Sequence, residues 1–130
     1  MGVEYGASSG FGFLVPVEEL EELSHNTEFE ESEYGFEDDE FGWWLVQDNP
    51  YLTYEIVGDH MKGENLSLAI VAKSTLTEVS HFGYESYVKK LPREGGSVGE
   101  RFALASLFIK LFNRDPEEED IGWYVATTVS

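Results

Sequence analysis

Apolar and polar side chains alternate along several stretches of the chain, and this two-residue period predicts β-strands. The clearest case is Leu66–Lys73, where the leucines share one face with Ile70 and Ala72. A second clean alternation runs from Ile121 to Val129. Further strands are expected at residues 10–16, 42–47 and 51–57, with one or two more within 75–88. The pattern therefore predicts about five or six short strands.

Two other segments have the spacing and the end signals of helices. Pro16 precedes a short helix predicted at Val17–Ser24, because proline is tolerated where the first helical N–H is unpaired anyway. Glu18 and Glu19 would lie at the positive end of its dipole. The sequence Ser97-Val98-Gly99-Glu100 matches the capping box and predicts the start of a longer helix that ends near Asn113.

The longer helix carries apolar residues around most of its circumference. Two apolar stripes follow the helical period. The first is made by Leu104, Leu107, Phe108 and Leu111, and the second by Phe102, Ala105, Ile109 and Phe112. Because only a narrow polar strip remains, we expect this helix to be largely buried.

These elements together indicate an α+β fold. Short connections between strands favour antiparallel pairing. We expect a mostly antiparallel sheet of about five or six strands, with the long buried helix packed on one face and a short N-terminal helix. A length of 130 residues fits a single domain, 1–130, and no internal repeat is present.

Charge is distributed very unevenly along the chain. Residues 1–61 contain sixteen Asp or Glu and no Lys or Arg, whereas residues 62–130 contain ten acids and all eight bases. The two parts carry −16 and −2, which gives the net charge of −18. Twelve of the twenty-three residues from Glu18 to Glu40 are acidic, and aromatic residues are interleaved with them. No clean period appears at 25–42, so we expect a long loop or a marginal helix there.

Composition excludes several classes of function. The chain has no cysteine and hence neither disulfides nor thiolate metal sites, which fits a reducing compartment. We see no targeting leader and no apolar run near the ~20 residues that span a bilayer, so we expect a cytoplasmic protein. The strong negative charge argues against direct contact with nucleic acid or anionic membranes.

The sequence matches to catalytic and metal-binding motifs lack the neighbouring elements or the spacing that these motifs require. Gly6–Gly10 fits the G-x-S-x-G elbow but leads into a strand rather than a helix, so we interpret it as a flexible entry segment. Ser86–Lys89 fits S-x-x-K without its companion motifs. The three histidines have no metal-ligand spacing, and Glu55 is expected on the solvent face of its strand. We therefore expect no enzyme, no cofactor and no metal.

In size, acidity and lack of cysteine, the chain resembles small phage-encoded inhibitors of host proteins, including DNA mimics. The resemblance implies an acidic protein that occupies a basic, nucleic-acid-binding surface of a partner protein. Our own interpretation of the acidic segment points the same way, because mixed acidic and aromatic segments dock on surfaces that are both basic and apolar. The expected partner-binding residues are Glu28, Glu30, Glu31, Glu33, Phe36, Glu37, Asp38, Asp39, Glu40 and Phe41.

Two other interpretations stay open at this point. The acidic run can be a solvated loop that only aids solubility. Alternatively, the chain is a structural or assembly module that forms a homo-oligomer through the apolar helix and the predicted tryptophan-rich strands. Salt dependence separates charge-driven binding from apolar assembly, because only the former weakens as salt rises.

Overall fold

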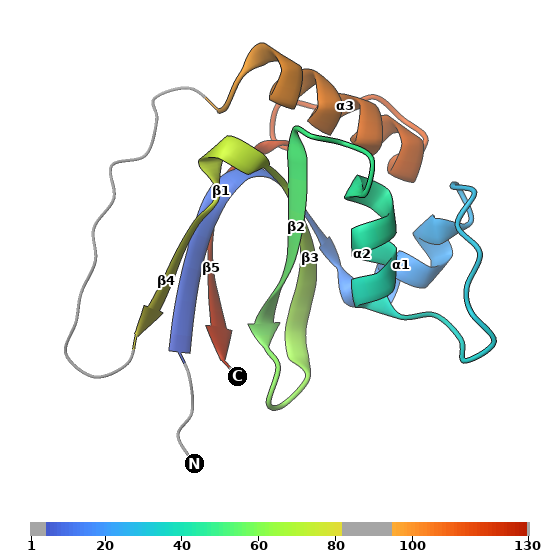
Figure 1. The fold of residues 1–130 in the computed structure, drawn as a ribbon, viewed down its shortest axis with the longest axis horizontal. Coiled ribbons are helices and arrows are strands. Elements are labelled where there is room, and N and C mark those ends of the chain that lie inside the picture. The colour runs from blue at the N-terminus through green and yellow to red at the C-terminus, as the bar shows by residue number, and fades with distance from the viewer. Residues whose placement is uncertain (1–4, 82–94, 130) are drawn as a thin grey trace.

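The computed structural model describes residues 5–81 and 95–129 (Figure 1). Five strands and three α-helices make up this part of the chain. The strands are β1 (Tyr5–Pro16), β2 (Leu52–Asp59), β3 (Glu64–Ala72), β4 (Thr77–His81) and β5 (Gly122–Val129). The helices are α1 (Val17–Ser24), α2 (Asp38–Val46) and α3 (Val98–Phe112), with a short 3-10 turn, η1, at Lys73–Thr75. The predicted α+β fold with a mostly antiparallel sheet is confirmed.

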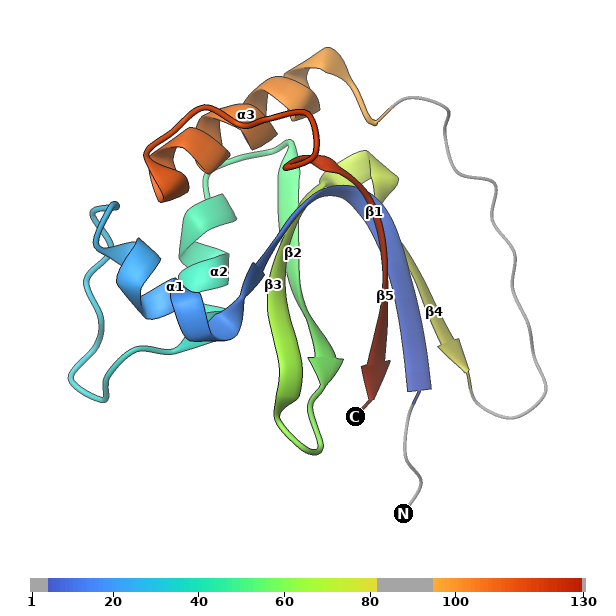
Figure 2. The same cartoon turned by 180° about the vertical axis from the view of Figure 1, so that it is seen from behind.

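The sheet bends because β1 is long and changes partners along its length. Its first half pairs with β4 on one side and β5 on the other, and its last residues pair with β3. The strand order is β3-β2-β5-β1-β4, with the extra β3–β1 pairing. The sheet consequently arches, as Figures 1 and 2 show. Gly12 lies where β1 meets both β3 and β5, and a Cβ there would overlap the carbonyl oxygen of Ile70.

The helices cover the outer face of this arch and enclose the core. α3 lies across the top, and α1 and α2 lie side by side beside β2 and β3 (Figure 1). Alternation along the strands directs one set of side chains toward these helices. The fully buried members of the core include Val15, Leu20, Phe41, Leu68, Ile70, Leu104 and Leu111. Phe13 and Phe108 meet edge to face across the sheet–helix boundary, with ring centroids 5.4 Å apart.

Three predictions about single elements were wrong. Residues 42–47 were expected to form a strand, but residues 42–46 belong to α2 and Gln47 is its C-cap. The helix wins because Asp38, Asp39 and Glu40 complement its positive N-terminal end, and because Phe41 and Val46 then face the core. Gly42 packs so closely on Tyr54 and Leu68 that a larger side chain would clash.

The second correction concerns residues 6–10. They are not a flexible entry segment but part of β1, where they pair with both β4 and β5.

The expected long loop at 25–42 ends earlier than predicted, at Glu37, because α2 begins at Asp38. Of the strands expected within 75–88, the structure shows β4; the S-x-x-K motif at 86–89 lies outside the described residues.

The third correction concerns α3. Its capping box is present as predicted, and its first apolar stripe is buried. Its second stripe is only partly buried, because the sheet covers one side of the helix: Phe112 packs against the core, but Phe102 is 73% exposed and Ile109 42% exposed. α3 therefore has an inner apolar face in the core and an outer apolar face toward solvent.

Candidate functional site

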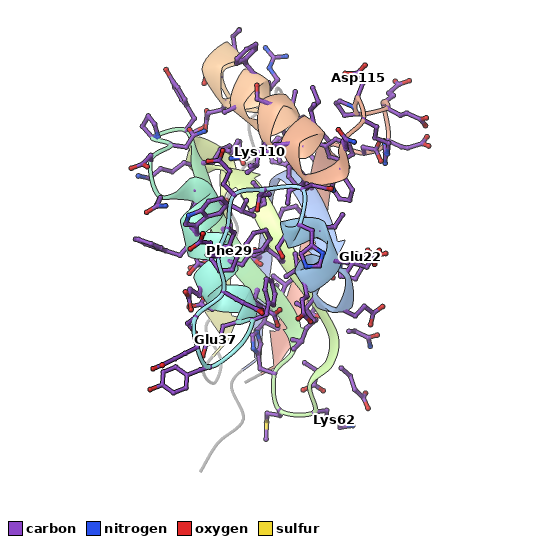
Figure 3. All side chains as sticks on the ribbon, turned by 90° about the vertical axis from the view of Figure 1, so that its right-hand side faces the viewer. Glu22, Phe29, Glu37, Lys62, Lys110 and Asp115 are labelled. Carbon is purple, nitrogen blue, oxygen red and sulfur yellow. The ribbon has the colours of Figure 1, made fainter. Side chains whose placement is uncertain are left out.

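Twelve of the sixteen acidic residues of the first half lie on α1, the following loop and the first turn of α2, on one side of the molecule. We use the name acidic face for the exposed carboxylates of α1, of the following loop at 25–37 and of the first turn of α2. Figure 3 views this side, with Glu22 of α1 and Glu37 of the loop pointing outward from neighbouring elements. The exposed members are Glu18, Glu19, Glu21, Glu22, Glu28, Glu30, Glu31, Glu33, Glu37 and Asp39. Asp38 and Glu40 are half-buried.

The predicted partner-binding residues divide into an exposed and a buried group. The glutamates at 28, 30, 31, 33 and 37 are all exposed, as a binding surface requires. Phe41 was expected among the partner-binding residues, but it is fully buried, because α2 turns its ring into the core. Phe36 is half-buried and contacts Phe41, with ring centroids 5.4 Å apart.

An aromatic cluster beneath the acidic face holds the loop to the core. Phe29 is its centre: its ring lies 5.0 Å from Phe41, 5.3 Å from Trp44 and 6.0 Å from Phe36. All three contacts are edge-on, the arrangement that aromatic quadrupoles favour. The three phenylalanines of the segment thus pack inward, while most of its acids point outward.

Hydrogen bonds fix the start of the same loop. The Asn26 side chain donates to the carbonyl oxygen of Leu111 in α3 at 2.6 Å. Thr27 Oγ1 donates to the carbonyl oxygen of Ser24 and accepts from the N–H of Phe29. The start of the loop is therefore held against α1 and α3.

One aromatic ring does point outward from the acidic face. Tyr34 is 86% exposed, at the tip of a turn closed by a hydrogen bond from the N–H of Gly35 to the carbonyl oxygen of Ser32. Gly35 has a φ of 99°, which a residue with a side chain rarely adopts. The sequence analysis did not list Tyr34 among the partner-binding residues, although the glycine directly after it signals a turn that would expose it.

Among the residues that the structure describes, no cationic side chain forms an ion pair with the acidic face. Within residues 5–81 and 95–129, the ion pair that the structure contains joins Arg114 and Asp120, 2.8 Å apart, after α3. The nearby ammonium group of Lys110 lies over the Trp44 ring, 5.2 Å from its centroid, and not on a carboxylate. The exposed carboxylates of the face therefore present a dense field of negative charge to solvent. Asp38, at the start of α2, differs from them, because partial burial raises its pKa.

A second polar group lies on the concave side of the arch. Glu55 Oε1 accepts hydrogen bonds from Ser8 Oγ at 2.6 Å and from the Tyr124 hydroxyl at 2.7 Å, so β2 is tied to β1 and β5. The expectation that Glu55 faces solvent was wrong, because the curvature of the sheet turns this face inward. Burial, followed by the hydrogen bond to Glu55, raises the pKa of Tyr124 far above its ordinary range.

Catalytic and metal chemistry receive no support from the described residues. Ser8 of the G-x-S-x-G sequence lies within β1 and is 5% exposed, so it is not presented on a strand-to-helix elbow. Within the described residues, the His, Asp and Glu side chains form no group of three placed to hold a metal ion. In the same part of the chain, every helix is too short or too polar to cross a membrane.

A hollow of about 580 Å³ lies between the start of α3 and the α2–β2 connection. Its walls are mostly apolar and include the exposed rings of Tyr51 and Phe102 together with Pro50 and Val98. Asp48 is the charged residue in its lining. The hollow is wide and open, which suits a side chain of another protein better than a small molecule enclosed on all sides.

Comparisons of the chain with protein-family models, with curated proteins and with solved structures each found no match.

Proposed function

We propose that this protein is a non-enzymatic binding module whose acidic face occupies a basic surface of a partner protein. The observation that carries the proposal is the combination of exposed carboxylates with a rigid support: ten acids point outward, while Phe29, Phe36, Phe41 and Trp44 lock the segment from beneath. A solubilising loop has no need of such support. A binding surface gains from it, because fixed charges lose less conformational freedom on association.

The partner that best fits this face is a nucleic-acid-binding protein. Duplex DNA carries a negative charge about every 1.7 Å of its axis, so proteins that bind it display dense basic surfaces. A folded array of carboxylates can occupy such a surface and exclude the nucleic acid. The compositional resemblance to DNA-mimic inhibitors agrees with this assignment, and inhibition by occupancy is the activity we propose.

Within the face, carboxylates and rings have separate tasks. The charges steer the partner and set the rate of association. The exposed Tyr34 ring replaces Phe41 as the proposed anchor, because interface energy concentrates in a few residues that become desolvated. Phe36 contributes mainly by supporting the loop, since its ring packs against Phe29 and Phe41.

The test compares two charge-reversal variants with equal net charge. Replacing Glu30, Glu31 and Glu33 by lysine alters the acidic face, and replacing Glu117, Glu118 and Glu119 by lysine alters an exposed acidic loop elsewhere. Partners are captured on immobilised wild-type protein, and association is followed by surface plasmon resonance at two salt concentrations. We expect only the first variant to slow association and to flatten its salt dependence. Duplex DNA should release the partner in competition.

Equal kinetics for the two variants would contradict the proposal, because net charge alone would then account for binding. Tyr34→Ala provides a second readout. It should speed dissociation with little effect on association, since a ring that contributes contact energy acts after the charges have steered the encounter.

A further inference from the structure

Two aromatic rings project into solvent beside the carboxylates of the acidic face. Tyr34 is 86% exposed in the loop, and Trp43 is 55% exposed on α2. The phenylalanines of the same segment, Phe29, Phe36 and Phe41, pack beneath the face instead. The segment therefore presents two kinds of group to a partner, which are negative charges and exposed aromatic rings.

The Tyr34 ring is held outward by its own turn. The N–H of Tyr34 donates to Ser32 Oγ at 3.3 Å, and the N–H of Gly35 donates to the carbonyl oxygen of Ser32 at 3.0 Å. The carboxylate of Glu33, directly before the ring, is exposed as well. The turn thus displays a flat ring and a negative charge next to each other.

Trp43 is exposed because α2 has an inner and an outer side. The next residue, Trp44, stacks on Phe41 with an interplanar angle of 15°, so it lies on the inner side. Trp43 follows it at an angle of about 100° around the helix and reaches solvent. Asp39 and Glu40 precede Trp43 by four and three residues, and this spacing places them on the same side of α2. The second exposed ring therefore also lies among carboxylates.

This combination of charges and exposed rings resembles a single nucleic-acid strand more than a duplex. A duplex stacks its bases inside and turns its phosphates outward, so a surface that imitates it needs mainly negative charge. A single strand exposes unstacked bases as well as phosphates. Proteins that bind single strands combine a basic groove with aromatic side chains on which the bases stack.

We propose that the acidic face imitates a single-stranded nucleic acid. Its carboxylates occupy the basic groove of a single-strand-binding protein, and the rings of Tyr34 and Trp43 stack on the aromatic side chains that otherwise receive bases. The inference rests on the proposed function and narrows the class of partner. A tyrosine or tryptophan ring can replace a base there, because such stacking depends on a flat π surface and not on the hydrogen bonds that identify a base.

The first test compares competitors for the partner captured on immobilised wild-type protein. Bound partner is eluted with oligothymidine, with oligouridine or with duplex DNA, at equal phosphate concentrations. We expect one of the two single strands to release the partner at a concentration about tenfold or more below that of the duplex, because it competes for both the groove and the stacking side chains. The more effective single strand shows whether the partner binds DNA or RNA.

The outcomes separate this inference from the proposed function. If duplex DNA releases the partner at the same concentration as the single strands or at a lower one, the inference is overturned and the proposed function stands. If no partner is captured, or if none of the three nucleic acids releases it, the proposed function fails and the inference fails with it.

The second test asks whether the two rings act by stacking. Tyr34→Phe keeps a flat ring and should leave the partner at the wild-type rate. Tyr34→Leu and Trp43→Leu keep an apolar side chain without a π surface, and each should speed dissociation about fivefold or more. Trp123→Leu is the matched control, because it removes a partly exposed tryptophan from β5, in the other limb of the arch from α1 and α2 (Figure 1). It should leave both rates unchanged.

Circular dichroism with thermal melting checks that every variant is folded. Surface plasmon resonance then measures the rates for each variant and for Glu30/Glu31/Glu33→Lys. Leucine variants that dissociate as slowly as wild type, while the lysine variant still slows association, would show that the face acts by charge alone and would overturn the inference.

Discussion

At the scale of single residues, the aromatic side chains of the acidic segment have two different tasks. Phe29, Phe36 and Phe41 pack on one another beneath the surface, whereas Tyr34 projects into solvent. A segment with this many carboxylates repels itself, and apolar contacts from within it are what keep it in place. The buried rings consequently hold the segment in the conformation that exposes its acids.

The stability of Phe41 and Tyr34 variants tests this division. Phe41→Ala should lower the free energy of unfolding by about 3–5 kcal/mol, because it removes a fully buried ring and leaves a cavity. Tyr34→Ala should change it by less than about 0.5 kcal/mol. Urea denaturation followed by tryptophan fluorescence measures both. A Phe41 variant as stable as the Tyr34 variant would mean that the aromatic cluster contributes little to the fold.

At the scale of elements, the start of α3 links the helix to the sheet through one carboxylate. Glu100 accepts hydrogen bonds from the N–H and hydroxyl of Ser74 and from the N–H of Ser97. Burial alone would raise the pKa of Glu100, but these hydrogen bonds outweigh it and lower the pKa below its ordinary value. The capping box thus serves two purposes, because the same glutamate caps α3 and holds the turn after β3.

The pH dependence of stability tests the role of Glu100. A lowered folded-state pKa stabilises the protein above the unfolded-state value of about 4.5, and this stabilisation is lost as pH falls through the folded-state pKa. Glu100→Gln should therefore cost about 1–3 kcal/mol near neutral pH, and the difference from wild type should shrink in acid. Urea unfolding at several pH values measures it. A difference that is constant with pH would rule out the charged carboxylate as the source.

At the scale of the whole molecule, charge and apolar surface are separated in space. The acidic face occupies α1, the loop and the start of α2, and the exposed apolar stripe runs along α3. Repulsion between the carboxylates of the acidic face opposes folding, and the free energy gained by packing the core must be larger than this repulsion. The molecule therefore keeps its densest negative charge and its exposed apolar side chains on different elements.

Salt should accordingly stabilise the fold. The Debye length falls from about 30 Å at 0.01 M to about 8 Å at 0.15 M ionic strength. Over this range we expect the melting temperature to rise by roughly 3–6 °C, which corresponds to about 1 kcal/mol for a chain of this size. The Glu30/Glu31/Glu33→Lys variant changes the net charge by +6, from −18 to −12, and should respond less. If scanning calorimetry gives both proteins the same rise in melting temperature with salt, charge repulsion on the acidic face does not destabilise the fold.

The sequence by itself determined the elements that local signals specify. The capping box at Ser97 and Glu100 located α3, strand alternation located β3 and β5, and the position of Pro16 located α1. These signals act between residues that are close along the chain, so they do not depend on the rest of the fold. The uneven distribution of charge along the chain was also known from the sequence, since counting acids requires no structure.

Only the tertiary structure decided which face each element shows to the core. Residues 42–47 carry strand-forming tryptophans, yet packing on Tyr54 and Leu68 and the acids before them made the segment helical. Both stripes of α3 are apolar in sequence, but the sheet covers the first and leaves Phe102 and Ile109 of the second exposed. Glu55 turned inward because β1 bends and closes the arch around it. Each outcome depends on contacts between residues far apart in the chain, which local periodicity does not encode.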